Sequence, residues 1–315
     1  MLTYCAYGIR LECSFELPGM PAAAAEVAGL PALELIGAPA GSLDEPAAAA
    51  SPLWEGLLGD GFSLSIGRAD AGELIFSYGQ SARFALAPDL RRMRCAHRDG
   101  GPGWQRALIG KVLPVVSLLL GYEALHASVL DSPEGAVAIM GPSGSGKSTL
   151  AAEAMRRGWP LFADDALILS GSTGAILAHP GTPHMNLDLD LPAGIDPDAL
   201  GRTLAVIAGE RWMAARASTA EPRPVAMLCL LERGPSRASA VRTLEPNPLA
   251  LAPYMLGLLE DGARQRDRFS LYADLIEQTP LVALSADAAL EPAALADLLE
   301  DALQHRCALP AGGVR

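Results

Sequence analysis

Lysine is almost absent from this 315-residue chain, in which Lys111 and Lys147 are the only two. The 36 acidic residues outnumber the 24 Lys and Arg residues, so the formal net charge is −12 and nearly all positive charge belongs to arginine. Phosphate backbones repel a chain of this charge, which argues against nucleic acid as the main partner. A lysine that falls inside a motif is therefore informative.

Long apolar runs are missing too, although half of the residues are hydrophobic. The longest candidate, residues 112–121, contains Pro114 and falls short of the roughly 18 to 20 apolar residues that span a bilayer. The first residues lack the basic start and apolar stretch of a signal peptide. We therefore expect a soluble, cytoplasmic protein with no membrane partner.

Cysteine is scarce and scattered, with no spacing typical of a zinc site or a redox pair. Such cysteines are expected to be buried or free thiols in a reducing compartment. The five residues are Cys5, Cys13, Cys95, Cys229 and Cys307.

The segment Gly141-Pro142-Ser143-Gly144-Ser145-Gly146-Lys147-Ser148 has the spacing of a phosphate-binding loop. Glycines in such a loop turn successive backbone N–H groups toward phosphate oxygens. Lys147 is expected to reach the β- and γ-phosphates of a nucleotide, and the Ser148 hydroxyl is expected to bind Mg²⁺. The flanks predict a buried strand over 135–140 and a helix over 149–157, whose N-terminus favours an anion. The residues predicted to contact the nucleotide are Gly141, Ser143, Gly144, Ser145, Gly146, Lys147, Ser148 and Thr149.

Two adjacent carboxylates, Asp164 and Asp165, interrupt an apolar stretch shortly after this loop. An Asp at a strand end beside a phosphate-binding loop normally holds Mg²⁺, and a second Asp can take the proton from an attacking hydroxyl. Neighbouring like charges raise the pKa of one of the two carboxyl groups, which suits a base acting near neutral pH. An Asp-Asp pair by itself also fits a surface turn between two strands. The position of the pair after the loop favours phosphoryl transfer.

The order of these motifs resembles the catalytic core of HPr serine kinase/phosphorylase, a family related in fold to phosphoenolpyruvate carboxykinase. The resemblance covers residues 126–169 and consists of His126-Ala127-Ser128-Val129-Leu130-Asp131, the loop, Arg156-Arg157-Gly158 and Ala163-Asp164-Asp165. It implies that His126 and Asp165 form the proton-handling centre and that Lys147 binds phosphate. It also implies Mg²⁺ at Ser148, which leaves Asp164 for the metal or for structure. Without the resemblance, a His at the start of a strand is more often structural.

Two positions depart from the family pattern: Pro142 stands where Asp is common, and Thr149 stands where Glu follows the Mg²⁺-binding serine. The predicted activity is therefore that of a kinase with little phosphorolysis.

A looser pattern, with a start like residues 4–13 and an aliphatic strand over 225–232, resembles the HPr-kinase-related proteins that phosphorylate lasso-peptide precursors. Residues 180–188 lack the later family signature and predict a Pro-bounded surface turn, with Asn186 or Asp188 as an alternative metal contact.

A glycine-rich break at 100–103 divides the chain into two predicted parts. Residues 1–100 hold short turn-bounded segments, at 2–17, 62–66, 73–78 and 82–86, which predict a small β-rich N-terminal lobe. Residues 101–315 begin with a helix over 104–120 and predict an α/β catalytic domain. The implied fold is α/β, with an HPr-kinase/phosphoenolpyruvate-carboxykinase-like P-loop core. Residues 196–220 and 287–304 predict further helix.

Together these features predict an ATP-dependent phosphotransferase that uses Mg²⁺ and transfers the γ-phosphoryl group to a hydroxyl. The expected catalytic residues are His126, Lys147 and Asp165, and the expected metal contacts are Ser148 and Asp164. The resemblance favours a Ser of a small protein or of a ribosomal precursor peptide as the acceptor. A kinase acting on a small metabolite and an ATP-gated regulatory or assembly protein are the alternatives. Homo-oligomer formation is left open.

Overall fold

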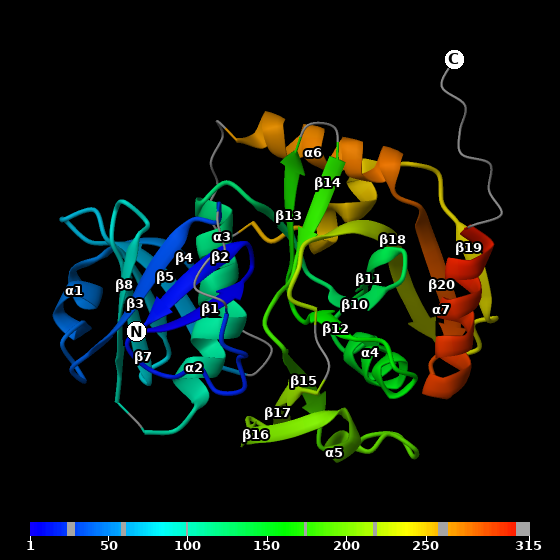
Figure 1. Cartoon of the computed structure of the whole chain (residues 1–315), viewed down its shortest axis with the longest axis horizontal. Helices are drawn as coiled ribbons and strands as arrows, with labels where there is room; N and C mark the ends of the chain where they lie inside the picture. The colour runs from blue at the N-terminus through cyan, green and yellow to red at the C-terminus, as the bar shows by residue number, and fades with distance from the viewer. Residues whose placement is uncertain are drawn as a thin grey trace.

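The computed structural model of the chain describes residues 1–23, 29–57, 61–98, 100–172, 175–216, 219–257 and 264–306. Within these ranges the chain forms a mixed α/β fold with three β-sheets. Figure 1 shows the first sheet at one side, the second in the centre and on the other side, and the smallest below the second. Across the described ranges no helix has the length and apolar character needed to cross a membrane.

The first sheet has eight described strands in the order β1-β2-β3-β8-β7-β6-β5-β4. They are β1 (Leu2–Ala6), β2 (Ile9–Cys13), β3 (Ala32–Ala38), β4 (Ser51–Leu57), β5 (Ser63–Arg68), β6 (Leu74–Tyr78), β7 (Ala82–Leu86) and β8 (Arg92–His97), and the short helix α1 (Asp44–Ala49) lies between β3 and β4 in sequence. β3 is parallel to both of its neighbours, whereas the other pairs are antiparallel. The predicted strands are confirmed in β1, β2, β5, β6 and β7, but the sequence analysis missed β3, β4 and β8. The strand β8 was missed because the charged side chains of Arg92 and Arg94 alternate with the buried Met93 and Cys95, so the segment shows no continuous apolar run.

One helical rod covers the first sheet. It consists of α2 (Gly103–Ala107), the π-helical turn η1 (Leu108–Val112) and α3 (Leu113–Leu119), which follow one another without a break. Trp104, Leu108 and Leu113 on the rod belong to one apolar core with Phe76 and Phe84 of the sheet. Figure 1 shows the rod between the first sheet and the rest of the molecule. The helix predicted over 104–120 is confirmed, and its apolar face explains its position.

The second sheet carries the predicted loop. Its nine described strands follow the order β12-β10-β11-β18-β14-β13-β9, with β20 paired to β18 and β19 paired to β20. They are β9 (Glu123–Leu125), β10 (Ser128–Ser132), β11 (Gly135–Met140), β12 (Leu161–Ala163), β13 (Leu167–Ser172), β14 (Ala175–His179), β18 (Arg223–Gly234), β19 (Ala240–Thr243) and β20 (Leu281–Asp287). The three central strands β11, β18 and β20 are parallel, so their carboxyl ends meet at one edge of the sheet.

Helices cover both faces of this sheet. The helices are α4 (Lys147–Arg156), α6 (Gln265–Gln278), α7 (Pro292–Arg306) and the 3₁₀ helix η2 (Pro248–Tyr254). Leu150 of α4 and Leu299 of α7 share a core with Val137 of β11, whereas Tyr272 of α6 belongs to another core with Met140. Val137 and Met140 lie three positions apart on the strand and therefore face opposite sides. The helices predicted over 149–157 and 287–304 are confirmed as α4 and α7, although residue 287 ends β20.

The third sheet corrects two predictions. It contains β15 (His184–Asp188), β16 (Gly201–Ile207) and β17 (Glu210–Ala215), all antiparallel, with the four-residue helix α5 (Pro197–Leu200) before β16. The surface turn predicted over 180–188 is wrong, because that segment forms β15, in which His184, Met185 and Leu187 are buried. The helix predicted within 196–220 is limited to α5. Strand pairing and burial against the core prevail there over the local alanine and leucine content.

The four described cysteines have no disulfide partners, and Cys13, Cys95 and Cys229 are buried while Cys5 is half-buried. This confirms the predicted buried or free thiols for these residues. Burial raises the pKa of the Cys13 thiol to about 12, so this group stays protonated at neutral pH. Cys307 lies outside the described residues.

Candidate active site

The loop predicted to bind phosphate joins the carboxyl end of β11 directly to the first turn of α4, since β11 ends at Met140 and α4 begins at Lys147. Gly144 and Gly146 have φ angles of 74° and 92°, a left-handed region that strains residues with side chains. A Cβ on Gly141 would lie 2.9 Å from the carbonyl oxygen of Leu231 in β18. These glycines are therefore required by backbone conformation and by close packing.

Lys147 folds across the loop that precedes it. Its ammonium donates to the carbonyl oxygens of Gly141, at 3.0 Å, and Pro142, at 3.2 Å. Burial lowers the pKa of Lys147, while the charges of Asp164 and Asp165 act in the opposite direction. The ammonium is thus partly desolvated, which strengthens its interaction with an anion.

A cleft of about 790 Å³ opens beside this loop. Of the predicted nucleotide contacts, Ser143, Gly144, Gly146, Lys147, Ser148 and Thr149 line it. Gly141 and Ser145 do not. Gly141 contributes its carbonyl oxygen to Lys147, and the Ser145 hydroxyl is buried with no hydrogen-bond partner among the described residues.

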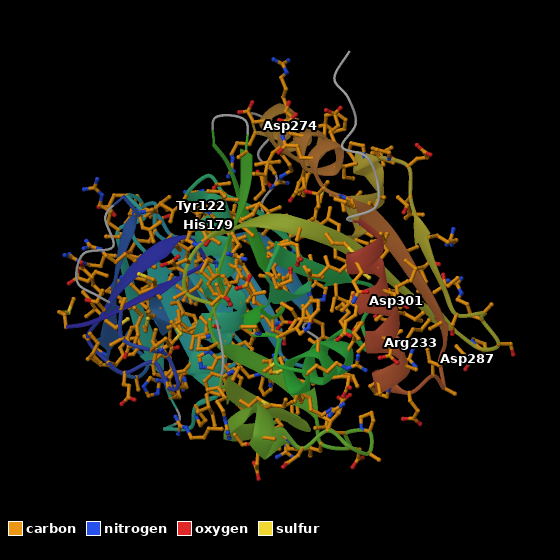
Figure 2. The ribbon with its side chains drawn as sticks, turned by 45° about the vertical axis from the view of Figure 1, so that its right-hand side comes forward. Tyr122, His179, Arg233, Asp274, Asp287 and Asp301 are labelled. Atoms are coloured by element: carbon orange, nitrogen blue, oxygen red, sulfur yellow. The ribbon has the colours of Figure 1, made fainter. Side chains whose placement is uncertain are left out.

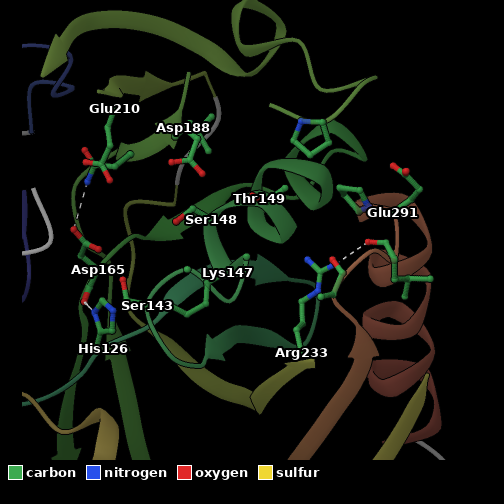
Figure 3. Close-up of a pocket in the computed structure, with 18 of the residues that line it drawn as sticks. His126, Ser143, Lys147, Ser148, Thr149, Asp165, Asp188, Glu210, Arg233 and Glu291 are labelled. Carbon is green, nitrogen blue, oxygen red and sulfur yellow. Dashed lines mark hydrogen bonds between the residues drawn. The ribbon is translucent and has the colours of Figure 1, made fainter. Parts of the chain in front are cut away.

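Asp165 and His126 line the same cleft and contact each other (Figure 3). The Nδ1 of His126 lies 2.9 Å from the backbone carbonyl oxygen of Asp165. A carbonyl oxygen only accepts, so Nδ1 carries the proton, and in a neutral ring Nε2 keeps its lone pair. Asp165 itself has a φ of 68°, a left-handed conformation that is uncommon for a residue other than glycine. Such backbone outliers cluster at functional sites.

The carboxylate of Asp165 is paired with a lysine that the sequence analysis did not assign to the site. Lys111 Nζ lies 3.1 Å from Asp165 Oδ2, and Asn186 Nδ2 lies 3.4 Å from the same oxygen. Burial raises the pKa of Asp165, but the charges of Lys111 and then His126 act against it and hold that pKa below its usual value. The carboxylate is therefore ionised at neutral pH, as a general base must be.

Asp164 faces a different environment from its neighbour. Its side chain is buried, its Oδ1 accepts from the Ser128 hydroxyl at 2.7 Å, and its Oδ2 accepts from the backbone N–H of Asn186 at 3.1 Å. Burial, followed by the charge of Asp165, raises its pKa. Asp164 does not line the cleft but a small cavity of about 20 Å³ behind it. These bonds tie β10 to β15.

Further residues complete the cleft, and the sequence analysis did not foresee that they meet there. Arg106 and Lys111 come from the helical rod, Asn186 and Asp188 come from β15, and Glu210 comes from β17. Arg106 forms an ion pair with Glu210. The scarcity of lysine was the one sequence signal that pointed to Lys111. Asn186 and Asp188 were offered from the sequence only as an alternative metal contact, and Arg106 and Glu210 carry no local motif, because they come from segments far apart in the chain.

The opposite end of the cleft is formed by Arg233 and residues 288–292. Arg233 follows directly on the aliphatic part of β18, and its Nη2 donates to the carbonyl oxygens of Asp287, Ala288 and Leu290. Figure 2 shows Arg233 and Asp287 together at the edge of the molecule, near the lower end of α7. Lys147 therefore lies between two chemically different ends, one with Asp165 and His126, the other with Arg233 and Glu291 (Figure 3).

The donors around the loop fit Mg²⁺ better than a protein-only metal cage. Within the described residues there is no group of three His, Cys, Asp or Glu side chains arranged to hold a metal ion. Mg²⁺ beside a nucleotide uses one or two carboxylates, phosphate oxygens and water, so it needs no such group. The Ser148 hydroxyl and the carboxylates of Asp165 and Asp188 line the cleft and supply that kind of donor.

Comparison with known proteins leaves the family undefined. No family model matches the chain, and no curated protein matches it. Among solved structures, the HPr(Ser) kinase/phosphatase from Coxiella burnetii matches with a TM-score of 0.33 and 14% sequence identity. The match covers 59% of this chain and 97% of that one. A likeness of this level carries no conclusion, so function must be argued from the cleft itself.

Proposed function

We propose that this chain is a phosphotransferase that moves the γ-phosphoryl group of ATP to a hydroxyl. The observation that carries the proposal is that the loop cation Lys147 and the ionised carboxylate Asp165 line one cleft, although they come from separate elements. In phosphoryl transfer, the protein supplies a cation that binds the phosphates and a base that accepts the proton of the attacking hydroxyl.

The nucleotide phosphates are assigned to the loop and the N-terminus of α4. Backbone N–H groups and the helix dipole favour the polyphosphate there, and Lys147 adds a charge-assisted bond. Ser148, together with Asp188, would hold Mg²⁺, and this ion, when bound, would neutralise charge on the phosphate oxygens. The sequence-based assignment of Asp164 to the metal gains no support, since both of its oxygens already accept protein hydrogen bonds.

Asp165 is assigned as the base that takes the proton of the acceptor hydroxyl. His126 supports it by fixing the backbone carbonyl of Asp165 through its Nδ1–H. The acceptor we propose is a Ser hydroxyl of a small protein or of a lasso-type precursor peptide. A small-metabolite kinase is the alternative within enzymes, and an ATP-gated regulatory or assembly protein is the alternative outside them. Pro142 and Thr149 favour a kinase with little phosphorolysis.

The first prediction concerns Lys147. Lys147→Ala should abolish turnover and weaken ATP–Mg²⁺ binding while leaving the fold intact, because it removes the cation that supports the developing charge. The measurement is transfer from labelled ATP to a panel of Ser-containing peptides and hydroxylated metabolites. The wild-type chain should label one class of acceptor. ATP binding without any labelled acceptor would favour the regulatory alternative, and full activity of Lys147→Ala would refute the site.

A further inference from the structure

The two lysines of the chain meet in one cleft. Lys147 comes from the loop and Lys111 from the helical rod that covers the first sheet, and both line the cleft. The chain has 24 basic side chains, of which 22 are arginine, so two lysines would rarely converge without a chemical reason. Lys111 is also partly exposed, with 28% of its side chain accessible, so its ammonium can reach a ligand.

The π-helical turn directs Lys111 into the cleft. Hydrogen bonds in such a turn join residues five apart, so the turn is wider than an α-helical one and brings positions five apart closer to the same face of the rod. Arg106 at the end of α2 and Lys111 in η1 are five positions apart, and both line the cleft and the small cavity that Asp165 also lines. A regular α-helix would separate these two positions around the axis. π turns inside helices are frequent at functional sites, and this one places two cations on one side.

The contact of Lys111 places its charge beside the base. Its ammonium is 3.1 Å from Asp165 Oδ2, and Asn186 of β15 donates to that same oxygen. A hydroxyl that gives its proton to Asp165 must lie against this carboxylate. The phosphoryl group that it attacks must then lie in the cleft that both Lys111 and Lys147 line.

We propose that Lys111 is a catalytic residue that binds the phosphoryl group during its transfer, as the counterpart of Lys147 across the cleft. The inference rests on the proposed function. In the step, the acceptor hydroxyl gives its proton to Asp165 and its oxygen forms the new bond to the γ-phosphorus. The bond between that phosphorus and the oxygen bridging to the β-phosphate breaks, and ADP leaves with the electron pair. Lys111 keeps its proton throughout and transfers its hydrogen bond from Asp165 to a phosphoryl oxygen.

The test uses ADP–Mg²⁺ with aluminium fluoride, a planar mimic of the phosphoryl group in transfer, and needs no knowledge of the acceptor. Calorimetry on the full chain should show that aluminium fluoride tightens ADP–Mg²⁺ binding. In Lys111→Met this extra affinity should fall by about 10- to 100-fold, the usual value of a charge-assisted bond, with ADP–Mg²⁺ affinity alone unchanged. Arg92→Met is the matched control, because it removes a cation that pairs with a carboxylate, Glu34 at 2.7 Å, outside the cleft.

A conservative variant separates chemistry from folding. Lys111→Arg keeps a cation next to Asp165 and should retain aluminium fluoride affinity within about tenfold of wild type, whereas Lys111→Met loses it. If both variants trap aluminium fluoride like wild type, Lys111 only balances the charge of Asp165 and the inference is overturned while the proposed function stands. If the wild-type chain binds ADP–Mg²⁺ but gains nothing from aluminium fluoride, both are overturned.

Discussion

At the scale of single residues, the site is defined by two neighbouring carboxylates in opposite surroundings. Asp165 faces the cleft, pairs with Lys111 and is ionised, whereas Asp164 is buried between Ser128 and Asn186 and has a raised pKa. Environments that separate the pKa values of two adjacent acids are typical of acid–base assignments in enzymes. The division of roles between them is therefore open to a direct test.

Asp165→Asn should lose phosphoryl transfer by roughly 10²- to 10⁴-fold, the usual scale of general-base catalysis, and should still bind ATP. The amide cannot take a proton from the acceptor at neutral pH. Turnover and nucleotide affinity, measured on the same preparation, separate these effects. Near-normal turnover would mean that Asp165 is not the base.

Asp164→Asn should chiefly lose stability, by about 1–3 kcal/mol, because the amide nitrogen cannot accept one of the two bonds that Ser128 and Asn186 donate. Denaturant unfolding measures this loss, and turnover per folded molecule should change less than in Asp165→Asn. An Asp164→Asn variant that is fully folded and inactive, beside an active Asp165→Asn variant, would reverse the roles. If both variants were active, neither carboxylate would take part in the chemistry and the Asp164-Asp165 pair would be only a structural turn.

At the scale of elements, β15 depends on a buried histidine. Its first residue, His184, stacks on Trp212 of β17 with ring centroids 5.0 Å apart, and its Nε2–H donates to the carbonyl oxygen of Pro18 at 2.6 Å. The strand is thereby tied to the segment that follows β2. Burial lowers the pKa of His184 from 6.5 to about 4.

This depressed pKa predicts acid sensitivity of folding. Between pH 6.5 and about 4 the unfolded chain binds a proton at His184 that the folded chain does not. The contribution of the neutral ring is complete above pH 6.5, and its loss over that window amounts to about 3 kcal/mol. Urea unfolding at several pH values should show a shallower decline for His184→Gln than for wild type. Parallel pH profiles for the two chains would contradict the assignment.

At the scale of the whole molecule, contacts cross the predicted division at residues 100–103. The backbone N–H of Tyr7 in the first sheet region donates to the carbonyl oxygen of Pro180 at 2.7 Å, and the Ser117 hydroxyl of α3 donates to the carbonyl oxygen of Tyr7 at 2.8 Å. The core of the first sheet also includes Trp212 of β17. The two-lobe division stays a prediction, and these contacts indicate how to test it.

Phe84→Ala, a change deep in the first sheet, should lower the free energy of unfolding of the chain by about 3–5 kcal/mol, and the proposed nucleotide site should lose the same stability. The shared core makes the parts unfold together. Circular dichroism and nucleotide binding, followed in parallel during unfolding, should give coincident transitions. Nucleotide binding that survives a first transition would instead establish an independent N-terminal lobe.

The sequence by itself determined the local features of this protein. The glycines of the loop are fixed by backbone angles and close packing that few other residues tolerate, and the strand before it and the helix after it follow from short-range patterns. Lys147 and Ser148 were therefore predicted from the loop motif, which depends on neighbours within a few residues and is visible in a single sequence. The role of His126 and the choice of Asp165 over Asp164 came from the family resemblance, and all four residues line the cleft.

Only the tertiary structure decided which distant residues share that cleft and which carboxylate faces it. Lys111 and Asp165 are separated by 54 positions, and Arg106 and Glu210 by 104. No periodicity links residues at such separations, because their meeting depends on how the rod packs on the first sheet and where β15 and β17 pair. Asp164 and Asp165 are identical in the sequence, and their different ionisation arises from burial and from partners that the chain brings together on folding.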